Sequence, residues 1–354
     1  MQKAHETAPG NLDVVRPTQV DPPTLSVVVP NYNHGKLISR AVTALLAQER
    51  PPDEIVIVDD GSTDDSLRVI EALAAGTKAI RVIANRTNEG ATAALGRGLD
   101  ACGGKYVYFA AADDWVLPGF FATVLPVLER HPQAGLACGE SHLVSGHTGE
   151  PIGVRPAVRP SNRTDYFAPA ATATLLKRID NWILTGSAIF VRDRVVAAGG
   201  FAADLGSFAD GYLARKVALT HGFCFVPRPM ATWQVFDDSL SRESAADPVE
   251  AQRVLAHAID HFARDPIFPP WYGALFRRRL QFGIARLAVS TEPMNRAVLA
   301  QASRGSLVDR MFVAAAARLP RPLLLGWLWL RFWPMNPLLI LRSAIQRYFA
   351  RMSS

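Results

Sequence analysis

The sequence has few cysteines, and their spacing builds neither a zinc site nor a disulfide framework. Its three cysteines, Cys102, Cys138 and Cys224, are far apart along 354 residues, so we interpret them as free thiols of a reducing compartment. A Walker lysine motif is also missing, which argues against ATP hydrolysis of that type. Residues 1–23 are polar and lack the apolar run of a signal peptide. We therefore expect a flexible leader there.

Lysine is absent between residues 271 and 354, where thirteen arginines accompany only two acidic residues. The net charge of +6 therefore comes from this part of the chain, and the remainder is net negative. The arginines are interleaved with Trp, Phe and Leu, a mixture that favours a membrane surface over nucleic acid as the partner.

Short apolar runs alternate with amphipathic stretches through the first two thirds of the chain. This alternation predicts an α/β fold, with a mixed, mostly parallel sheet flanked by helices. The glycine- and proline-rich stretch 141–162 is expected to be a loop, and 244–319 to be helical. Strands are expected at 25–29, 54–58, 79–84, 105–110, 134–138, 188–191 and 223–226, and helices at 36–48, 67–73, 90–101, 118–130, 193–198 and 210–220.

Polar clusters follow three of the expected strands, at residues 30–33, 59–60 and 113–114. Ligands of such sheets bind beyond the carboxyl ends of the strands. We therefore expect these clusters to converge on one edge of the sheet and to form a site.

Asp113 and Asp114 are the sharpest of these signals. Two carboxylates after an apolar strand repel each other, so the pair raises one pKa or requires a cation. A bound Mg²⁺ or Mn²⁺ would take carboxylate oxygens and share its shell with substrate phosphates. The alternative is that the pair caps the following helix, which Pro118 helps to start.

Asp59 and Asp60 also allow two interpretations. A strand end, a Gly61 turn and a capped helix account for one acidic residue. The doubled acid favours a carboxylate that also faces the cleft and accepts a hydrogen bond from a base or a ribose.

Three stretches of the chain together resemble family 2 glycosyltransferases, which are inverting enzymes of the GT-A fold. They are SVVVPNYNHGKLISRAVTALLAQERPPDEIVIVDDGSTDDS, NEGATAALGRGLDACGGKYVYFAAADDWVLP and GGFAADLGSFADGYLARKVA, and the resemblance runs over residues 24–242. It implies a GT-A domain at 24–243, with a nucleotide-binding half (24–140) and an acceptor half (141–243). A helical extension would follow at 244–354.

The resemblance also implies roles for the residues that bind the donor. Tyr32 would border the nucleobase, in a loop that includes Pro30 and Asn33. Asp60 would hydrogen-bond the base, usually uracil, with Asp59 beside it.

Further along the chain, Asp113 would bind the nucleotide and, with Asp114, the metal ion. Asp210 would be the general base, at a helix start that favours its ionised form. Residues 185–187 would lie near the acceptor cleft. Trp233, with the segment 237–242 after it, resembles a closing loop over the donor, although Trp233 alone also fits a core residue.

The chain departs from the family pattern at three places. Ala111 stands where the first Asp of the usual Asp-x-Asp-Asp run is found, and Ala209 stands where an acidic residue usually precedes the base. Leu95 and Gly96 replace an Arg-Asn pair that follows the Asn-x-Gly turn. These losses motivate an alternative hypothesis, a non-catalytic nucleotide-binding scaffold of the same fold.

The segment 322–350 is expected to associate with a membrane. Its core, residues 323–341, has about the length needed to span a bilayer, but Arg331, Pro334 and Pro337 interrupt it. The mixture of Arg, Trp and Leu better suits a helix lying in the interface. The alternative is a C-terminal helix buried against the catalytic domain or a partner chain.

Together these observations predict a metal-dependent inverting transferase, with Mn²⁺ or Mg²⁺ as cofactor. It would move a sugar from a nucleoside diphosphate donor to a hydroxyl of a glycan or lipid-linked acceptor. We expect the donor to be a UDP-linked sugar. The setting would be cell-surface polysaccharide or glycolipid synthesis at the cytoplasmic face of the membrane, where the protein would be peripheral. A metal-dependent nucleotidyltransferase is the mechanistic alternative.

Overall fold

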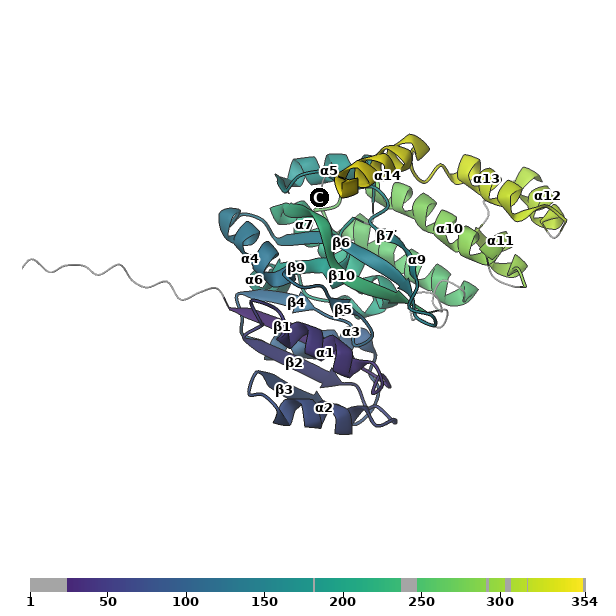
Figure 1. The fold of residues 1–354 in the computed structure, drawn as a ribbon. Coiled ribbons are helices and arrows are strands. Elements are labelled where there is room, and N and C mark those ends of the chain that lie inside the picture. The colour runs from purple at the N-terminus through teal and green to yellow at the C-terminus, as the bar shows by residue number, and fades with distance from the viewer. Residues whose placement is uncertain are drawn as a thin grey trace, which may run out of the picture.

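The chain folds around one mixed sheet covered by helices, with further helices after it (Figure 1). The computed structural model describes residues 24–180, 182–236, 247–290, 293–302, 307–316 and 318–352. The strands are β1 (Leu25–Asn31), β2 (Glu54–Asp59), β3 (Ile80–Ala84), β4 (Tyr106–Phe109), β5 (Trp115–Val116), β6 (Leu136–Ser145), β7 (Pro151–Arg155), β8 (Asp165–Phe167), β9 (Ala188–Val191) and β10 (Phe223–Val235).

Helices connect most of these strands and then continue to the end of the described chain. They are α1 (Ile38–Leu46), α2 (Ser66–Ala75), α3 (Ala91–Ala101), α4 (Phe120–Arg130), α5 (Pro169–Arg178), α6 (Arg192–Ala197), α7 (Ala209–His221), α9 (Pro248–Arg264), α10 (Tyr272–Ser290), α11 (Arg296–Ala302), α12 (Leu307–Ala315), α13 (Arg321–Phe332) and α14 (Pro337–Met352). Two short 3₁₀ turns, η1 (Thr185–Ser187) and η2 (Ala203–Phe208), precede β9 and α7.

The sheet has the strand order β3-β2-β1-β4-β9-β6-β10-β5. Strands β3, β2, β1 and β4 are parallel, and β9 is antiparallel to both β4 and β6. Strand β10 runs parallel to β6, whereas β5, β7 and β8 attach in the antiparallel sense. The predicted mixed, mostly parallel α/β sheet is therefore confirmed.

Each central strand buries both of its faces. In β1, Val27 and Val29 join one hydrophobic cluster with α1 and α4, while Val28 joins the opposite cluster with α3 and α7. This follows from the alternation of side chains along a strand. On the second face, Gly98 of α3 lies so close to Val28 that a methyl group there would overlap it.

The expectation of a loop over 141–162 is wrong. Strand β6 continues to Ser145, and β7 returns against it from Pro151 to Arg155. Turn residues such as Gly149, at φ 74°, form the end of a β-hairpin here, because the flanking residues form backbone hydrogen bonds between β6 and β7. The helix α5 and the strand β8 were also not expected.

The helices α9 to α13 form a separate hydrophobic cluster that includes Leu324, Leu328 and Phe332 of α13. The apolar segment 323–341 is divided between α13 and α14, with Trp333 in a left-handed conformation between them. Within the described residues, no helix combines the length and apolar character needed to cross a membrane. Helix α14 instead returns to lie beside α5 (Figure 1).

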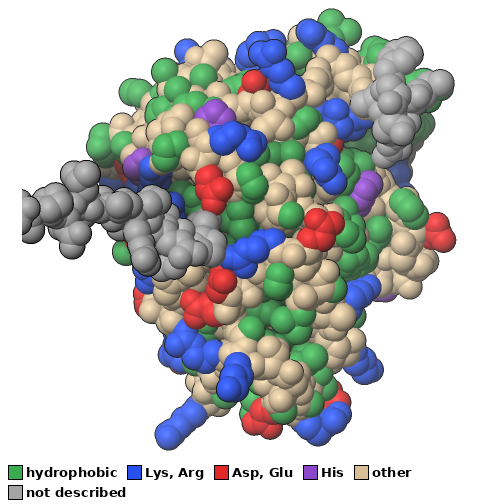
Figure 2. All heavy atoms as spheres, turned by 60° about the vertical axis from the view of Figure 1, so that its left-hand side comes forward, with side chains coloured by type: hydrophobic (Ala, Val, Ile, Leu, Met, Phe, Trp, Pro, Cys, Tyr) green, Lys and Arg blue, Asp and Glu red, His purple; other side chains and the backbone are tan. Residues whose placement is uncertain are grey.

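Two of the predicted boundaries lie outside the described residues, namely the leader 1–23 and the junction at 243–244. The division into domains therefore stays a prediction. The face shown in Figure 2 carries acidic and basic side chains interspersed with apolar ones, without one large patch of a single sign.

Candidate active site

The ends of β1 and β2 meet at the predicted edge of the sheet. Asn31 is the register partner of Asp59, and its buried side chain donates a hydrogen bond to Asp59 Oδ1 at 2.8 Å. Ser62 Oγ donates to the same oxygen at 2.6 Å. Asp59 therefore closes the turn after β2 and fixes the adjacent loop.

The loop that contains Tyr32 is held by side-chain bonds to the turn after β2. Asn33 has a positive φ of 57°, which Asn tolerates better than most residues. Its Oδ1 accepts from the backbone N–H of Thr63 at 2.8 Å, and its own N–H donates to Ser62 Oγ at 3.0 Å. Tyr32 is 41% exposed, so its ring is available at this edge, with Pro30 in the strand before it.

The carboxylate of Asp60 is buried and connects β2 to the start of α3. It accepts hydrogen bonds from Asn85 Nδ2 at 2.7 Å, from Gly90 N at 2.7 Å and from Glu89 N at 3.1 Å. These donors account for most of its acceptor capacity. The geometry thus gives Asp60 a positioning role, and its contact with a nucleobase stays a prediction.

The acid pair does not cap the following helix. Helix α4 begins at Phe120 after Gly119, with no side-chain cap, and the element directly after Asp114 is the short strand β5. The hypothesis that Asp113 and Asp114 serve only as a helix cap is therefore wrong.

Asp114 faces β10, where its Oδ1 accepts from Gln234 N at 2.7 Å. Burial, together with the neighbouring charge of Asp113, raises the pKa of Asp114 well above its usual value. Within the described part of the chain, the Asp113 carboxylate accepts no hydrogen bond. The two side chains therefore leave several carboxylate oxygens without donors.

Arg40 of α1 lies beside this pair. Its guanidinium stacks 3.9 Å from the centre of the Trp115 ring and donates to the backbone oxygen of Asp113 at 3.2 Å. Burial lowers the pKa of Arg40, an effect that the charges of Asp114 and Asp113 oppose. The site therefore already contains one positive charge next to its two carboxyl groups.

Asp210 lies in the first turn of α7 and is linked to the acid pair through η1. Thr185 Oγ1 donates to Asp210 Oδ2 at 2.9 Å. At the next residue, a methyl group built on Gly186 would lie 4.0 Å from Asp114 Oδ2. Tyr108 of β4 anchors this turn by donating to Gly186 O at 2.9 Å. Two predicted site residues that are 96 positions apart in the sequence are thus brought to the same turn.

Burial raises the pKa of Asp210 above its usual value, and the hydrogen bonds from Thr185 and Gly211 oppose that effect. The nearby guanidinium of Arg215 opposes it further. A carboxylate with a raised pKa is a stronger base than an ordinary one, which suits proton abstraction from a hydroxyl.

Trp233 lies in β10, next to the Gln234 that binds Asp114. Its register partner is Leu143 of β6, and it is half-buried. The closing segment 237–242 that was expected after it lies outside the described residues.

The donor set at Asp113 and Asp114 fits a hard divalent cation. Among the described residues, no group of three or more His, Cys, Asp or Glu side chains gathers to hold a metal. Mg²⁺ commonly needs only one or two carboxylates, because substrate phosphates and water complete its shell. Two adjacent carboxylates with unused oxygens match that pattern.

Three residues of this site were not predicted, namely Tyr108, Arg40 and Gln234. Each belongs to an element whose own pattern is ordinary: a buried strand, an exposed helix face and a long strand. The packing of α1 and β10 against β5 places Arg40 and Gln234 beside the acid pair, and the hydrogen bond to Gly186 O places Tyr108 at the adjoining turn.

The sequence comparisons agree with this geometry. Residues 26–196 match the family model described as Glycosyl transferase family 2. An uncharacterized protein of Mycobacterium tuberculosis is 28% identical over 253 residues, which cover 70% of this chain and 75% of that protein. A GalNAc(5)-diNAcBac-PP-undecaprenol beta-1,3-glucosyltransferase of Campylobacter jejuni is 32% identical over 104 residues, or 29% of this chain and 34% of that enzyme. Residues 26–196 therefore form a glycosyl transferase family 2 domain, and the protein is a glycosyltransferase.

Solved structures support the fold. S. aureus TarS 1–349 in complex with UDP-GlcNAc has a TM-score of 0.57 at 14% identity, covering 94% of this chain and 92% of that one. The mannosyltransferase PcManGT of Pyrobaculum calidifontis, in complex with GDP-Man and Mn²⁺, has a TM-score of 0.53 at 21% identity, covering 93% and 88%. The chain therefore has the GT-A fold.

Proposed function

We propose that this protein transfers a sugar, with inversion, from a UDP-linked donor to a hydroxyl of a glycan or lipid-linked acceptor. The observation that carries the proposal is the η1 turn, where Thr185 binds Asp210 and Gly186 adjoins Asp114. A base and a donor-binding acid pair next to one turn suit a single displacement at an anomeric carbon, in which the base removes the proton of the acceptor hydroxyl.

Asp210 accepts the proton of the acceptor hydroxyl as the new glycosidic bond forms. Thr185 holds its Oδ2, so the carboxylate keeps one orientation while the acceptor approaches. The location of Asp210 at the start of α7 stabilises its ionised form, which partly offsets the cost of burial.

The donor lies along the edge formed by the ends of β1, β2 and β4. Tyr32 borders the base, while Asp59, Asp60 and Asn33 shape the loops around it. Asp113 and Asp114 would hold the divalent ion, Mn²⁺ or Mg²⁺. When bound, the ion supplies Lewis-acid stabilisation of the leaving nucleoside diphosphate.

A lipid-linked acceptor at the cytoplasmic face of the membrane is part of the same proposal. The similar Campylobacter jejuni enzyme is named for an undecaprenol-linked substrate. The arginine-rich helices after residue 271 would keep this protein at such a surface, in the synthesis of cell-surface polysaccharide or glycolipid.

A melting-temperature screen of nucleotide sugars, with and without Mn²⁺, tests donor binding, because ligands of the folded state raise its melting temperature. The donor that binds is then used to identify the leaving group. Release of a nucleoside diphosphate supports the transferase, whereas release of pyrophosphate identifies a nucleotidyltransferase.

Asp210→Asn separates catalysis from binding. The proposal requires that this variant keeps the donor-dependent rise in melting temperature and loses turnover. A wild-type protein that binds donors but never turns over would instead identify the non-catalytic scaffold suggested by Ala111 and Ala209.

A further inference from the structure

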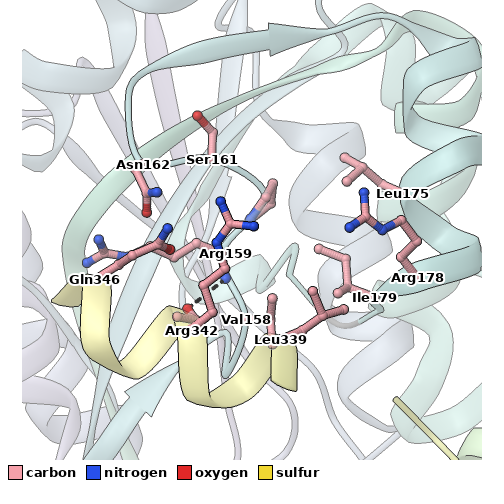
Figure 3. Close-up of a pocket in the computed structure, with 12 residues that line it drawn as sticks. Val158, Arg159, Ser161, Asn162, Leu175, Arg178, Ile179, Leu339, Arg342 and Gln346 are labelled. Atoms are coloured by element: carbon pink, nitrogen blue, oxygen red, sulfur yellow. Dashed lines mark hydrogen bonds between the residues drawn. The ribbon is translucent and has the colours of Figure 1, made fainter. Parts of the chain in front are cut away.

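A small cavity lies between the acceptor half and the last helix, α14. Figure 3 shows Leu175 and Arg178 of α5 on one side and Leu339, Arg342 and Gln346 of α14 on the other. The connection between β7 and β8 closes it with Ser161 and Asn162. Segments more than 150 residues apart in the sequence thus build one cavity, and none of them contributes to the site around Asp210.

The cavity is lined by arginines and by no acidic residue among those described. Arg159 and Arg347 share the buried carboxylate of Glu140, with hydrogen bonds of 2.7–3.0 Å, so this cluster keeps a net positive charge. Within the described chain, Arg178 and Arg342 make no hydrogen bond or ion pair. Two uncompensated guanidinium groups at one cavity are an anion-binding arrangement, and the guanidinium fork matches phosphate oxygens.

The size of the cavity limits what it can hold. Its volume is about 220 Å³, below the roughly 300–1,000 Å³ of pockets that enclose drug-sized ligands. A phosphate group with a small substituent fits this volume better than a complete nucleotide sugar does.

The outer face of α14 indicates where such a phosphate comes from. Leu338, Leu341 and Ile345 are 68%, 58% and 47% exposed, and their spacing places them on one face of the helix. The opposite face packs inward through Leu339 and the buried Ser343, whose Oγ accepts from the backbone N–H of Arg159 at 3.3 Å. An exposed apolar face beside free arginines is typical of a helix that lies in a membrane interface.

We propose that this cavity, which we call the α14 pocket, binds the phosphate of an anionic membrane lipid while the outer face of α14 enters the interface. The inference rests on the proposed membrane location and deepens it by naming the residues that recognise the headgroup. Arg178 and Arg342 bind the phosphate, and Leu338, Leu341 and Ile345 contact the acyl region.

The test is co-sedimentation of the full chain with vesicles of phosphatidylcholine, with and without phosphatidylglycerol. We expect the wild-type protein to prefer the anionic vesicles by at least about tenfold, since each arginine at such a surface strengthens binding severalfold. The double variant R178Q/R342Q should lose this preference. The control R86Q/R130Q removes the same charge from exposed positions elsewhere and should keep it.

Two further measurements make the result decisive. L341S/I345S should weaken binding to both kinds of vesicle, because it removes apolar contact and leaves the arginines. Inorganic phosphate is the second probe. If it raises the melting temperature of the wild type but not of R178Q/R342Q, while neither protein prefers anionic vesicles, the pocket binds free phosphate and the lipid proposal is wrong. Equal loss of preference in the control pair would also overturn it, because general charge would then explain binding.

The donor assay keeps this proposal separate from the proposed function. R178Q/R342Q should retain the donor-dependent rise in melting temperature, since neither arginine lies in the candidate active site. A wild type without any donor response would contradict the transferase and would leave the vesicle result standing.

Discussion

The hydrogen bond between Thr185 and Asp210 provides the sharpest test of the catalytic site. Thr185→Val keeps the shape of the side chain but removes the hydroxyl that donates to Asp210 Oδ2 at 2.9 Å. A hydrogen bond to a charged group stabilises it by about 1.5–3 kcal/mol, and about 1.4 kcal/mol corresponds to one pKa unit. The pKa of Asp210, already raised by burial, should therefore rise by a further one to two units, roughly.

The assay is the pH dependence of nucleoside diphosphate release. Because the base acts in its ionised form, activity rises with pH through the pKa of Asp210, and Thr185→Val should move this rise to higher pH. At a fixed pH on the rising limb, the variant should be about 10- to 100-fold slower, and it should recover at high pH. Thr185→Ser keeps the hydroxyl and serves as the matched control. A uniform loss of rate with an unmoved profile would refute the proposed link.

Four other substitutions test the protonation of Asp210, the C-terminal helices and the core. Burial raises the folded-state pKa of Asp210, so the stability that its carboxyl group contributes is present at low pH and is lost as pH rises through that pKa. The variant Asp210→Asn should therefore melt at a higher temperature than the wild type at about pH 8 but not at about pH 4. Equal melting temperatures of the two proteins at both pH values would argue against a raised pKa. Arg331 forms two hydrogen bonds of 2.8 Å with the fully buried carboxylate of Asp309. Arg331→Met should therefore lower the free energy of unfolding, measured in urea, by about 3 kcal/mol. An unchanged midpoint of urea unfolding would show that the ion pair is dispensable. On α3, Gly98→Ala should destabilise the folded protein by about 1–3 kcal/mol. A methyl group at Gly96 meets open space, so Gly96→Ala should stabilise the protein by about 0.5–1 kcal/mol. A Gly98→Ala variant more stable than Gly96→Ala would contradict the packing of α3 on β1.

The first half of the sheet was predictable because its signals are local. The buried run before Pro30 and the alternating strands and helices up to residue 140 follow from side-chain periodicity alone. The same locality placed the acidic residues at strand ends, since a parallel sheet brings those ends to one edge.

The second half was less predictable because its strands depend on distant partners. Pro227 and Pro229 indicate the end of a strand after Val226, yet β10 continues to Val235 with register shifts around Pro229. These shifts accommodate residues that cannot donate to the ladder. The prediction of a loop over 141–162 is wrong for a related reason. The pairing between β6 and β7 outweighs the turn-rich composition of this stretch.

The candidate site was only partly accessible from sequence. Asp114 and Asp210 are recognisable by local pattern and resemblance, but the Thr185–Gly186 turn that joins them is a tertiary feature. The sequence predicts the location of Asp60 at the end of a strand but not its hydrogen bonds, because its backbone donors at Glu89 and Gly90 come from the next connection of the chain.

The most direct measurement is a manganese anomalous difference map from crystals grown with Mn²⁺ and UDP. We expect one strong peak bonded to carboxylate oxygens of Asp113 and Asp114. We also expect the diphosphate on the same ion and the uracil beside Tyr32. A manganese ion held elsewhere, or a nucleotide bound away from this edge of the sheet, would contradict the proposed donor site.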